Sequence, residues 1–245
     1  MIEIVGETLP TAACRSAERR ACFDLLDRLF LGVTWAEFVR DFEEKDAVML
    51  LRDGATGTIG GFSTVTELEL EVADELVPIV YSGDTAVLPE YRTSFALGQE
   101  LARQFLAAYE RHPGRPVSYV LISKGWRTYK ILPFFFREFF PCHDAATPPA
   151  ARALMDAFGA ARFPAQYDDG VIRFAEDAPR LRPDGVDAFP DRDDVHTAFF
   201  RRANGGYLDG DELVCTARID PANFTRQLTR LLGLAARDGV ATTLA

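Results

Sequence analysis

Lysine is almost absent from this chain. Lys45, Lys124 and Lys130 are the only lysines among 27 basic residues, so arginine carries nearly all of the positive charge. Acidic residues number 37, which gives a formal net charge of −10. Non-specific nucleic-acid binding needs clustered basic residues. The charge balance therefore predicts no nucleic-acid partner, although it leaves room for a local basic patch.

Cysteine is also scarce, and its spacing excludes two kinds of site. Cys14, Cys22, Cys142 and Cys215 show no C-x-x-C pattern, so neither a zinc site nor a redox pair is indicated. On one helix Cys14 and Cys22 would lie about 12 Å apart along the axis, which is too far for a disulfide. We expect reduced thiols and no metal.

Long apolar runs and flexible linkers are missing as well. No apolar run approaches about 20 residues, and no basic segment followed by an apolar core opens the sequence. No Ser/Gly-rich stretch separates two halves. We expect a cytoplasmic protein that does not contact a membrane. We also expect one domain over residues 1–245, with an insert at about 142–211 and a C-terminal helix.

The most informative stretch runs over residues 77–106. It begins with β-branched and aromatic residues that favour a strand, interrupted at Gly83. Pro89 ends the strand because its ring nitrogen cannot donate a hydrogen bond. From Leu97 the apolar period becomes 3.6, with Leu101 and Phe105 on the same face. The stretch thus predicts a strand, a tight turn and a helix whose N-terminus can bind phosphate.

Residues 87–92, Val-Leu-Pro-Glu-Tyr-Arg, followed by Gly98 and Leu101, resemble the acyl-CoA-binding segment of the GNAT acyltransferases. In that family a central strand ends in V-x-P-x-x-R and leads into a glycine-containing pyrophosphate loop and a helix. The loop here lacks two of the glycines of the family pattern. The resemblance implies that the thioester donor is contacted by Val87, Arg92, Thr93, Ser94 and Gly98.

The predicted order of elements points to the same family. Patterns along the first 141 residues read β-α-α-β-β-β-α-β-α, and residues 170–175 and 212–219 supply two later strands. The GNAT order is the same. The expected fold class is α/β (α+β), with a mixed, mostly antiparallel sheet flanked by helices. The resemblance implies that this sheet splays between the strands at 77–88 and 117–123.

Acyl transfer to an amine needs a base, donors for the oxyanion and a proton for the leaving thiolate. Asp84 is the only carboxylate in the predicted central strand, so it is the candidate base, flanked by Ser82. Residues 82–84 are equally typical of a plain bulge. Tyr129 is the candidate proton donor because phenylalanine, at Phe136, stands where the family has tyrosine. The alternative is that Tyr129 packs with its hydroxyl at the surface.

Residues that could bind a substrate lie on both sides of the predicted cleft. Lys124 belongs to a basic group beside aromatic residues, which can hold a phosphate or an acidic carrier protein or can simply be solvated. His196 lies in the insert, and Arg201 is suited to clamp a carboxylate. Together with Tyr81 they are the candidate substrate contacts. Residues 177–194 resist any regular assignment, and such a long excursion is either a lid or a surface loop.

The resemblance implies an N-acyltransferase that moves an acyl group from a CoA or acyl-carrier-protein thioester to a small amine. Acyl-CoA or acyl-phosphopantetheine would be the donor. An acyl carrier protein is the possible protein partner, because the pyrophosphate loop departs from the family pattern. Two alternatives stay open. One is a binding or regulatory protein that has lost catalysis, and the other is an enzyme of different thioester chemistry on the same fold.

Overall fold

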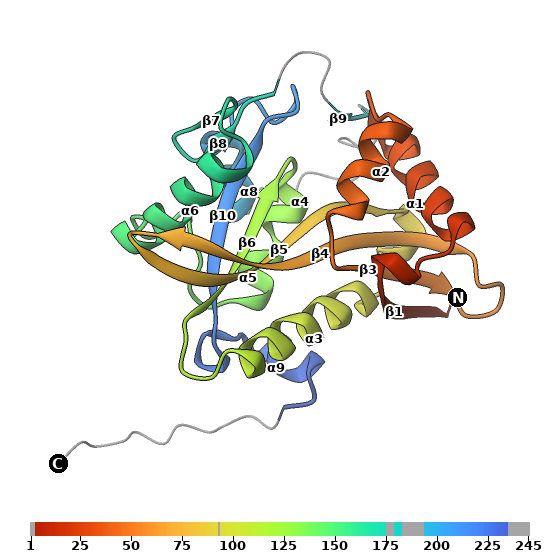
Figure 1. The fold of residues 1–245 in the computed structure, drawn as a ribbon, viewed down its shortest axis with the longest axis horizontal. Coiled ribbons are helices and arrows are strands. Elements are labelled where there is room, and N and C mark those ends of the chain that lie inside the picture. The colour runs from red at the N-terminus through yellow and green to blue at the C-terminus, as the bar shows by residue number, and fades with distance from the viewer. Residues whose placement is uncertain (1–2, 93, 175–178, 183–193, 235–245) are drawn as a thin grey trace.

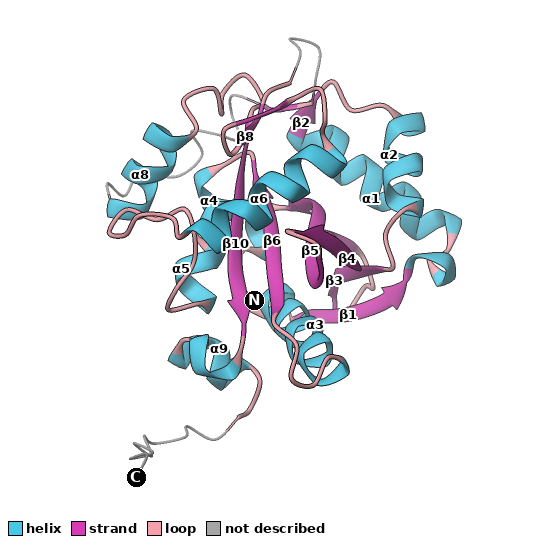
Figure 2. Ribbon diagram, turned by 60° about the vertical axis from the view of Figure 1, so that its left-hand side comes forward, coloured by secondary structure: helices cyan, strands magenta, loops and turns pink. Residues whose placement is uncertain are grey.

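The computed structural model describes residues 3–92, 94–174, 179–182 and 194–234. An eight-stranded sheet with the order β1-β3-β4-β5-β6-β10-β8-β7 runs through this part of the chain (Figures 1 and 2). In chain order its strands are β1 (Ile4–Pro10), β3 (Ala47–Asp53), β4 (Ile59–Val72), β5 (Glu75–Val87), β6 (Val117–Ser123), β7 (Tyr167–Asp168), β8 (Val171–Ile172) and β10 (Glu212–Ile219). Among these strands β5 and β6 pair in parallel and the other neighbours are antiparallel. The predicted mixed, mostly antiparallel sheet is confirmed.

Helices cover both faces of the sheet. Those of the described residues are α1 (Ser16–Leu29), α2 (Trp35–Glu43), α3 (Ala96–Arg111), α4 (Trp126–Tyr129), α5 (Ile131–Phe135), α6 (Pro149–Arg162), α8 (Val195–Ala203) and α9 (Arg226–Leu231). Figure 1 shows α1 and α2 above the sheet and α3 and α9 below it. Apolar side chains of α1, α2 and α6 pack on one face, and those of α3, α5, α8 and α9 on the other. Such alternate burial is what the period-2 pattern of the strands dictates.

The separation of β5 and β6 is the feature that makes room for a site. The two strands pair in register only from Ile79 with Ser118 to Ser82 with Leu121. After Ser82 the described residues of β5 pair only with β4. The β4–β5 register shifts between Ser63 and Val65, so a bulge lies where the strands part. The prediction that these two strands are sheet neighbours and splay apart is confirmed.

Part of the insert reaches back to the N-terminal helices. A two-stranded sheet joins β2 (Phe30–Leu31), directly after α1, to β9 (Arg180–Leu181). The Arg182 side chain donates to the Asp27 carbonyl at 3.0 Å. Segments about 150 residues apart in sequence are thereby joined at one end of the large sheet, where their side chains can close a cavity.

Several sequence-based boundaries were wrong. The predicted helix over 126–140 is two short helices, α4 and α5, and the chain leaves the helix after Phe135. Pro133 was expected to kink this helix or to mark its true start, and the break between α4 and α5 falls just before it, because α5 begins at Ile131. The strand expected at 170–175 is only the two residues of β8, and the helix expected at 223–237 is described only as the six residues of α9. Most of the irregular segment 177–194 lies outside the described residues.

Side-chain hydrogen bonds at their N-termini stabilise the helices that border the parted strands. Thr34 caps α2, and its Oγ1 accepts from the Glu37 N–H at 3.3 Å. The Ser94 Oγ accepts from the Ala96 N–H at 3.0 Å, where α3 begins. Asp194 caps α8 in the same way, accepting from the Thr197 N–H at 2.9 Å. Each cap satisfies donors that the first helical turn leaves free.

No helix among the described residues is long and apolar enough to cross a membrane.

Candidate active site

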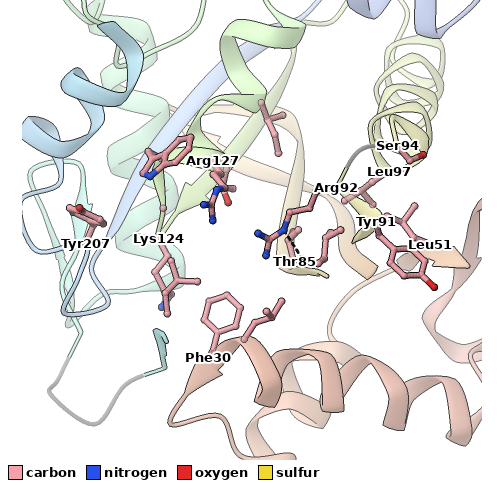
Figure 3. A pocket seen from close by; sticks show the side chains of 17 residues that line it. Phe30, Leu51, Thr85, Tyr91, Arg92, Ser94, Leu97, Lys124, Arg127 and Tyr207 are labelled. Carbon is pink, nitrogen blue, oxygen red and sulfur yellow. Dashed lines mark hydrogen bonds between the residues drawn. The ribbon is translucent and has the colours of Figure 1, made fainter. Parts of the chain in front are cut away.

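A cavity of about 380 Å³ lies where β5 and β6 part (Figure 3). Thr85 and Val87 line it from β5, beyond the last residue that pairs with β6. Its other walls come from the end of α1, the loop that leads into α3, the start of α4, and β9. These walls are formed by Leu29, Phe30, Leu51, Tyr91, Arg92, Ser94, Leu97, Lys124, Gly125, Trp126, Arg127, Thr128, Ile131, Leu181 and Tyr207.

The polar part of this cavity is cationic. Arg92, Arg127 and Lys124 line it, and none of the described residues that line it is acidic. Figure 3 shows the guanidinium groups of Arg92 and Arg127 pointing toward one another. Burial lowers the pKa of Arg127, and the charge of Arg92 lowers it further. In a protein of net charge −10, this concentration of positive charge favours an anionic ligand.

Asp84 lies next to the cavity and does not line it. Its neighbour Thr85 points into the cavity, whereas the half-buried Asp84 is on the bulge. Burial and the nearby Asp41 raise the pKa of Asp84 to about 7, and Lys45 and Lys124 oppose the shift. A carboxyl with a pKa near neutrality is suited to general-base chemistry. The sequence predicted a position beside the strand break and within the cleft; Asp84 lies at the break, but Thr85 and not Asp84 lines the cavity.

Tyr129 lies in the core, outside the cavity. Its side chain is 0% exposed, and its hydroxyl donates to the Pro141 carbonyl at 2.9 Å. The ring packs on Phe199 and Phe200 of α8, and burial raises its pKa. The structure therefore gives Tyr129 no access to a leaving group. It also corrects the expectation that the hydroxyl reaches the surface, because α8 covers it.

Ser82 and Tyr81 are buried near the bulge. The Ser82 Oγ lies 2.6 Å from the Tyr119 Oη, so this hydroxyl is engaged within the sheet. Tyr81 packs on Phe158 of α6, with ring centroids 5.0 Å apart. Neither residue lines the cavity. The structure places both beside the break as predicted, in supporting positions and not at the cavity wall.

The predicted donor-binding residues divide into two groups. Val87, Arg92 and Ser94 line the cavity, and Arg92 Nε donates to the Val87 carbonyl at 2.8 Å. Gly98 lies inside α3, where a Cβ would come 3.2 Å from the Phe135 ring, so its small size serves helix packing. Thr93 lies outside the described residues.

Of the three predicted substrate contacts distant from β5, only Lys124 reaches the cavity. Its Nζ donates to Glu212 at 3.0 Å and to the Pro179 carbonyl at 2.8 Å. His196 stacks on His143 with ring centroids 4.8 Å apart. Neither His196 nor Arg201 of α8 lines the cavity. The helix of the insert covers Tyr129 and does not form an acceptor wall.

Sequence reasoning expected the apolar turn at residues 30–33 on the acceptor side of the cleft, but it missed Leu181, which closes the cavity beside Phe30. Phe30 and Leu181 form one registered pair of the β2–β9 sheet, and both line the cavity. Arg127 belongs to the same basic group as Lys124, and the sequence placed Arg92 near this group if two helices flank one cleft; both arginines line the cavity. Lys45 and Asp41 had no assigned role. The only sequence signal for Lys45 was its rarity, since it is one of three lysines.

No family model matches this chain, and no curated protein matches it. Among solved structures, a protein from Enterococcus faecalis described as a "Probable N-Acyltransferase" aligns at 14% identity and a TM-score of 0.39, over 52% of this chain and 31% of that one. A GNAT family N-acetyltransferase from Escherichia coli in complex with CoA aligns at 18% identity and a TM-score of 0.37, over 51% of this chain and 64% of that one. NAA60 from Arabidopsis thaliana, in complex with acetyl-CoA, aligns at 14% identity and a TM-score of 0.39, over 58% and 90%.

The chain thus spans 31% and 64% of the lengths of the first two structures. Similarity at this level carries no argument about activity, substrate or partner. What the described residues show directly is the element order, the sheet order and the parting of a parallel strand pair at a bulge. These features make a mixed, mostly antiparallel sheet whose one parallel strand pair, among the described residues, parts at a bulge.

Proposed function

We propose that this protein is an N-acyltransferase that moves an acyl group from a CoA thioester to a small amine. The observation that carries the proposal is the position of the cavity. It opens where β5 and β6 cease to pair, and the carboxyl of Asp84 lies on the same bulge. For this chemistry the thioester has to extend from the cavity past Thr85 to the carboxyl of Asp84, whose pKa is about 7.

The walls of the cavity suit such a donor. Arg92 and Arg127 offer planar guanidinium groups, which bind phosphate oxygens with two parallel hydrogen bonds. The start of α3 adds backbone N–H groups near Ser94. Apolar side chains, among them Phe30 and Leu181, can contact the uncharged arm and the acyl chain. An acyl-phosphopantetheine on a carrier protein offers the same arm, so it remains the alternative donor.

The chemistry follows from these positions. The acceptor reacts as the neutral amine, and its nitrogen forms a bond to the thioester carbon while Asp84 takes the proton that the nitrogen loses. Backbone N–H groups at the bulge stabilise the oxyanion. The C–S bond then breaks, and the thiolate takes the proton from Asp84, which returns the carboxyl to its ionised form. An amide and a free thiol are the products, and no residue other than Asp84 is assigned a proton-transfer step.

A rival proposal, that the fold only binds a ligand, predicted that a side chain plugs the cleft. Phe95 and the loop 177–194 were the named candidates. Phe95 is 61% exposed, stacks on Phe134 and does not line the cavity. Most of the loop lies outside the described residues, and Leu181 from its described part lines the cavity. The position of Phe95 supports catalysis over a cleft plugged by that side chain.

Ligand binding is the first test. Acetyl-CoA, a long-chain acyl-CoA and an acyl carrier protein are each titrated against the full chain while the melting temperature is recorded. A ligand that binds only the native state, at about 100 times its Kd, stabilises by about 2.7 kcal/mol. A rise with either acyl-CoA, followed by release of free thiol when amines are added, supports the proposal. No rise with any of the three donors contradicts it.

A further inference from the structure

The proposed function leaves the buried charge of Lys45 without a role. Lys45 follows α2, and its side chain is 0% exposed. The Nζ lies 2.6 Å from an Asp41 carboxylate oxygen and donates to the Asp41 carbonyl at 3.1 Å. A buried ammonium is costly to desolvate even when it is paired. A chain with only three lysines nevertheless keeps one of them here.

The aliphatic end of Lys45 lies directly against the β5 bulge. A Cβ added to Gly83 would come 2.7 Å from the Lys45 Cε and 2.7 Å from the Thr64 Oγ1. A side chain at position 83 would therefore displace Lys45 or Thr64 from its place against the bulge. The ammonium also lies 5.8 Å from the centre of the Tyr81 ring. Asp84 is the next residue along the bulge, so Lys45 and Asp84 are neighbours across it.

We propose that Lys45, anchored by Asp41 beneath the bulge, is a positioning residue that sets the charge state of the base Asp84. This inference rests on the proposed function only in calling Asp84 the base. The electrostatic pairing of Asp41, Lys45 and Asp84 can be tested without any assay of activity.

The charged groups that face Asp84 come from three elements. Asp41 and Lys45 belong to α2 and the turn after it, Lys124 follows β6, and Glu212 begins β10. Lys124 is bound to Glu212 at 3.0 Å, just as Lys45 is bound to Asp41. Tyr81, the remaining titratable neighbour, is held neutral by a raised pKa. Two ion pairs therefore surround one additional carboxyl.

Lys45 and Asp41 shift the ionisation of Asp84 in opposite directions. A nearby cation favours the ionised carboxylate, and a nearby anion favours the protonated form. Removing Lys45 should therefore raise the pH at which Asp84 ionises, and removing the Asp41 charge should lower it. If Lys45 only filled space beneath the bulge, the two substitutions would not shift the ionisation of Asp84 in opposite directions.

The test compares Lys45→Met, Asp41→Asn and Lys130→Met in the full chain. Methionine keeps the unbranched stem of Lys45 without its charge. Lys130 is the matched control, because it is paired with Asp194 and is not among the charges that act on Asp84. The side-chain carboxyl of Asp84 is followed by carbon-13 NMR over pH 4–9 and is assigned by its disappearance in Asp84→Asn.

We expect the midpoint to rise by about one unit or more in Lys45→Met. It should fall in Asp41→Asn and stay unchanged in Lys130→Met. Midpoints that do not move, or that move in the same direction in Lys45→Met and Asp41→Asn, overturn the inference. If Lys45→Met does not fold, Asp41→Asn decides alone, because its carboxylate is 42% exposed and an unchanged midpoint there rejects the role.

Different results would reject Asp84 as the base and Lys45 as the residue that controls its charge. If Asp84→Asn keeps full turnover, Asp84 is not the base, and the NMR midpoints still report whether Lys45 controls its charge. If Asp84→Asn is inactive and the midpoints do not respond to Lys45, the proposed function stands and the role of Lys45 is rejected.

Discussion

The hydroxyls of Ser82 and Tyr119 lie 2.6 Å apart and link β5 to β6 at the last point where the two strands pair. Both side chains are buried, and Tyr119 packs on Phe105 of α3, with ring centroids 4.7 Å apart. Beyond this link the strands part and the cavity begins. The link therefore fixes the point from which the splay starts.

A double-mutant cycle of Ser82→Ala and Tyr119→Phe should reveal this link as a coupling energy. Each single variant leaves a buried hydroxyl without its partner, which costs about 1–3 kcal/mol. The double variant removes both groups, so its loss of stability should be smaller than the sum of the single losses by about 1 kcal/mol. Urea unfolding measures all four proteins. Strictly additive losses would show that the two hydroxyls do not cooperate.

Asp84→Asn should lower kcat/KM by about 10²–10⁴-fold, because a general base typically contributes that much. In the wild-type protein the base is active when ionised, so kcat/KM should rise with pH through about 7 and level off above it. The profile is measured with a saturating donor and limiting amine between pH 5 and 9. Near-full turnover by a correctly folded Asp84→Asn protein would remove Asp84 from the mechanism.

Stability should depend on the same carboxyl. The pKa of Asp84 is raised in the native state from its ordinary 3.8 to about 7. Between these values the native state binds more protons than the unfolded state, so the free energy of unfolding falls as pH rises through this window. Asp84→Asn removes the cost of the buried charge. We expect this variant to be more stable than the wild-type protein at pH 8, by roughly 2 kcal/mol, and the difference to shrink below pH 7.

Thermal melting of both proteins at pH 5 and pH 8 measures this difference. Surface ion pairs such as Arg19–Glu43 are present in both proteins, so their contribution to the melting temperature cancels in the comparison. If Asp84→Asn is equally destabilised at both pH values, Asp84 contributes to packing and the burial of its charge does not cost stability.

Arg127→Met should weaken binding of CoA by about tenfold to a hundredfold, as expected from the loss of one or two charge-assisted hydrogen bonds. The dependence of the Kd on salt should also become shallower, because one cation fewer faces the ligand. Arg137→Met makes the same charge change at an exposed position outside the cavity and is the control. Calorimetry at two salt concentrations measures both effects. Equal behaviour of the two variants would exclude Arg127 from the donor site.

Tyr129→Phe should keep turnover and lose about 1–2 kcal/mol of stability. The hydroxyl donates to the buried Pro141 carbonyl, and that acceptor would be left without its partner. Because the ring remains, packing on Phe200 is preserved. A large fall in kcat, with stability unchanged, would restore Tyr129 as a proton donor and contradict its placement in the core.

The fold was largely predictable because its signals are local. A run of alternating apolar residues predicts a strand wherever it occurs, and the strands β6 and β10 have the ranges that their sequence patterns indicate. The cap at Thr34 is likewise set by a residue three positions away. The helix expected over 126–140 was wrong because the aromatic residues after Phe135 lie in the core as extended chain, covered by distant segments.

The candidate site could be predicted only in part, because much of it depends on contacts between residues far apart in the sequence. The sequence by itself placed Asp84 beside a strand break, Val87 at the end of that strand, and Arg92 and Ser94 in the loop before a helix. It could not show that α8 buries Tyr129, because that contact joins residues about 70 positions apart. Nor could it show that Asp41 and Lys45 approach the bulge. A pKa and an access path depend on which distant groups desolvate or face a side chain, and only the tertiary structure determines that.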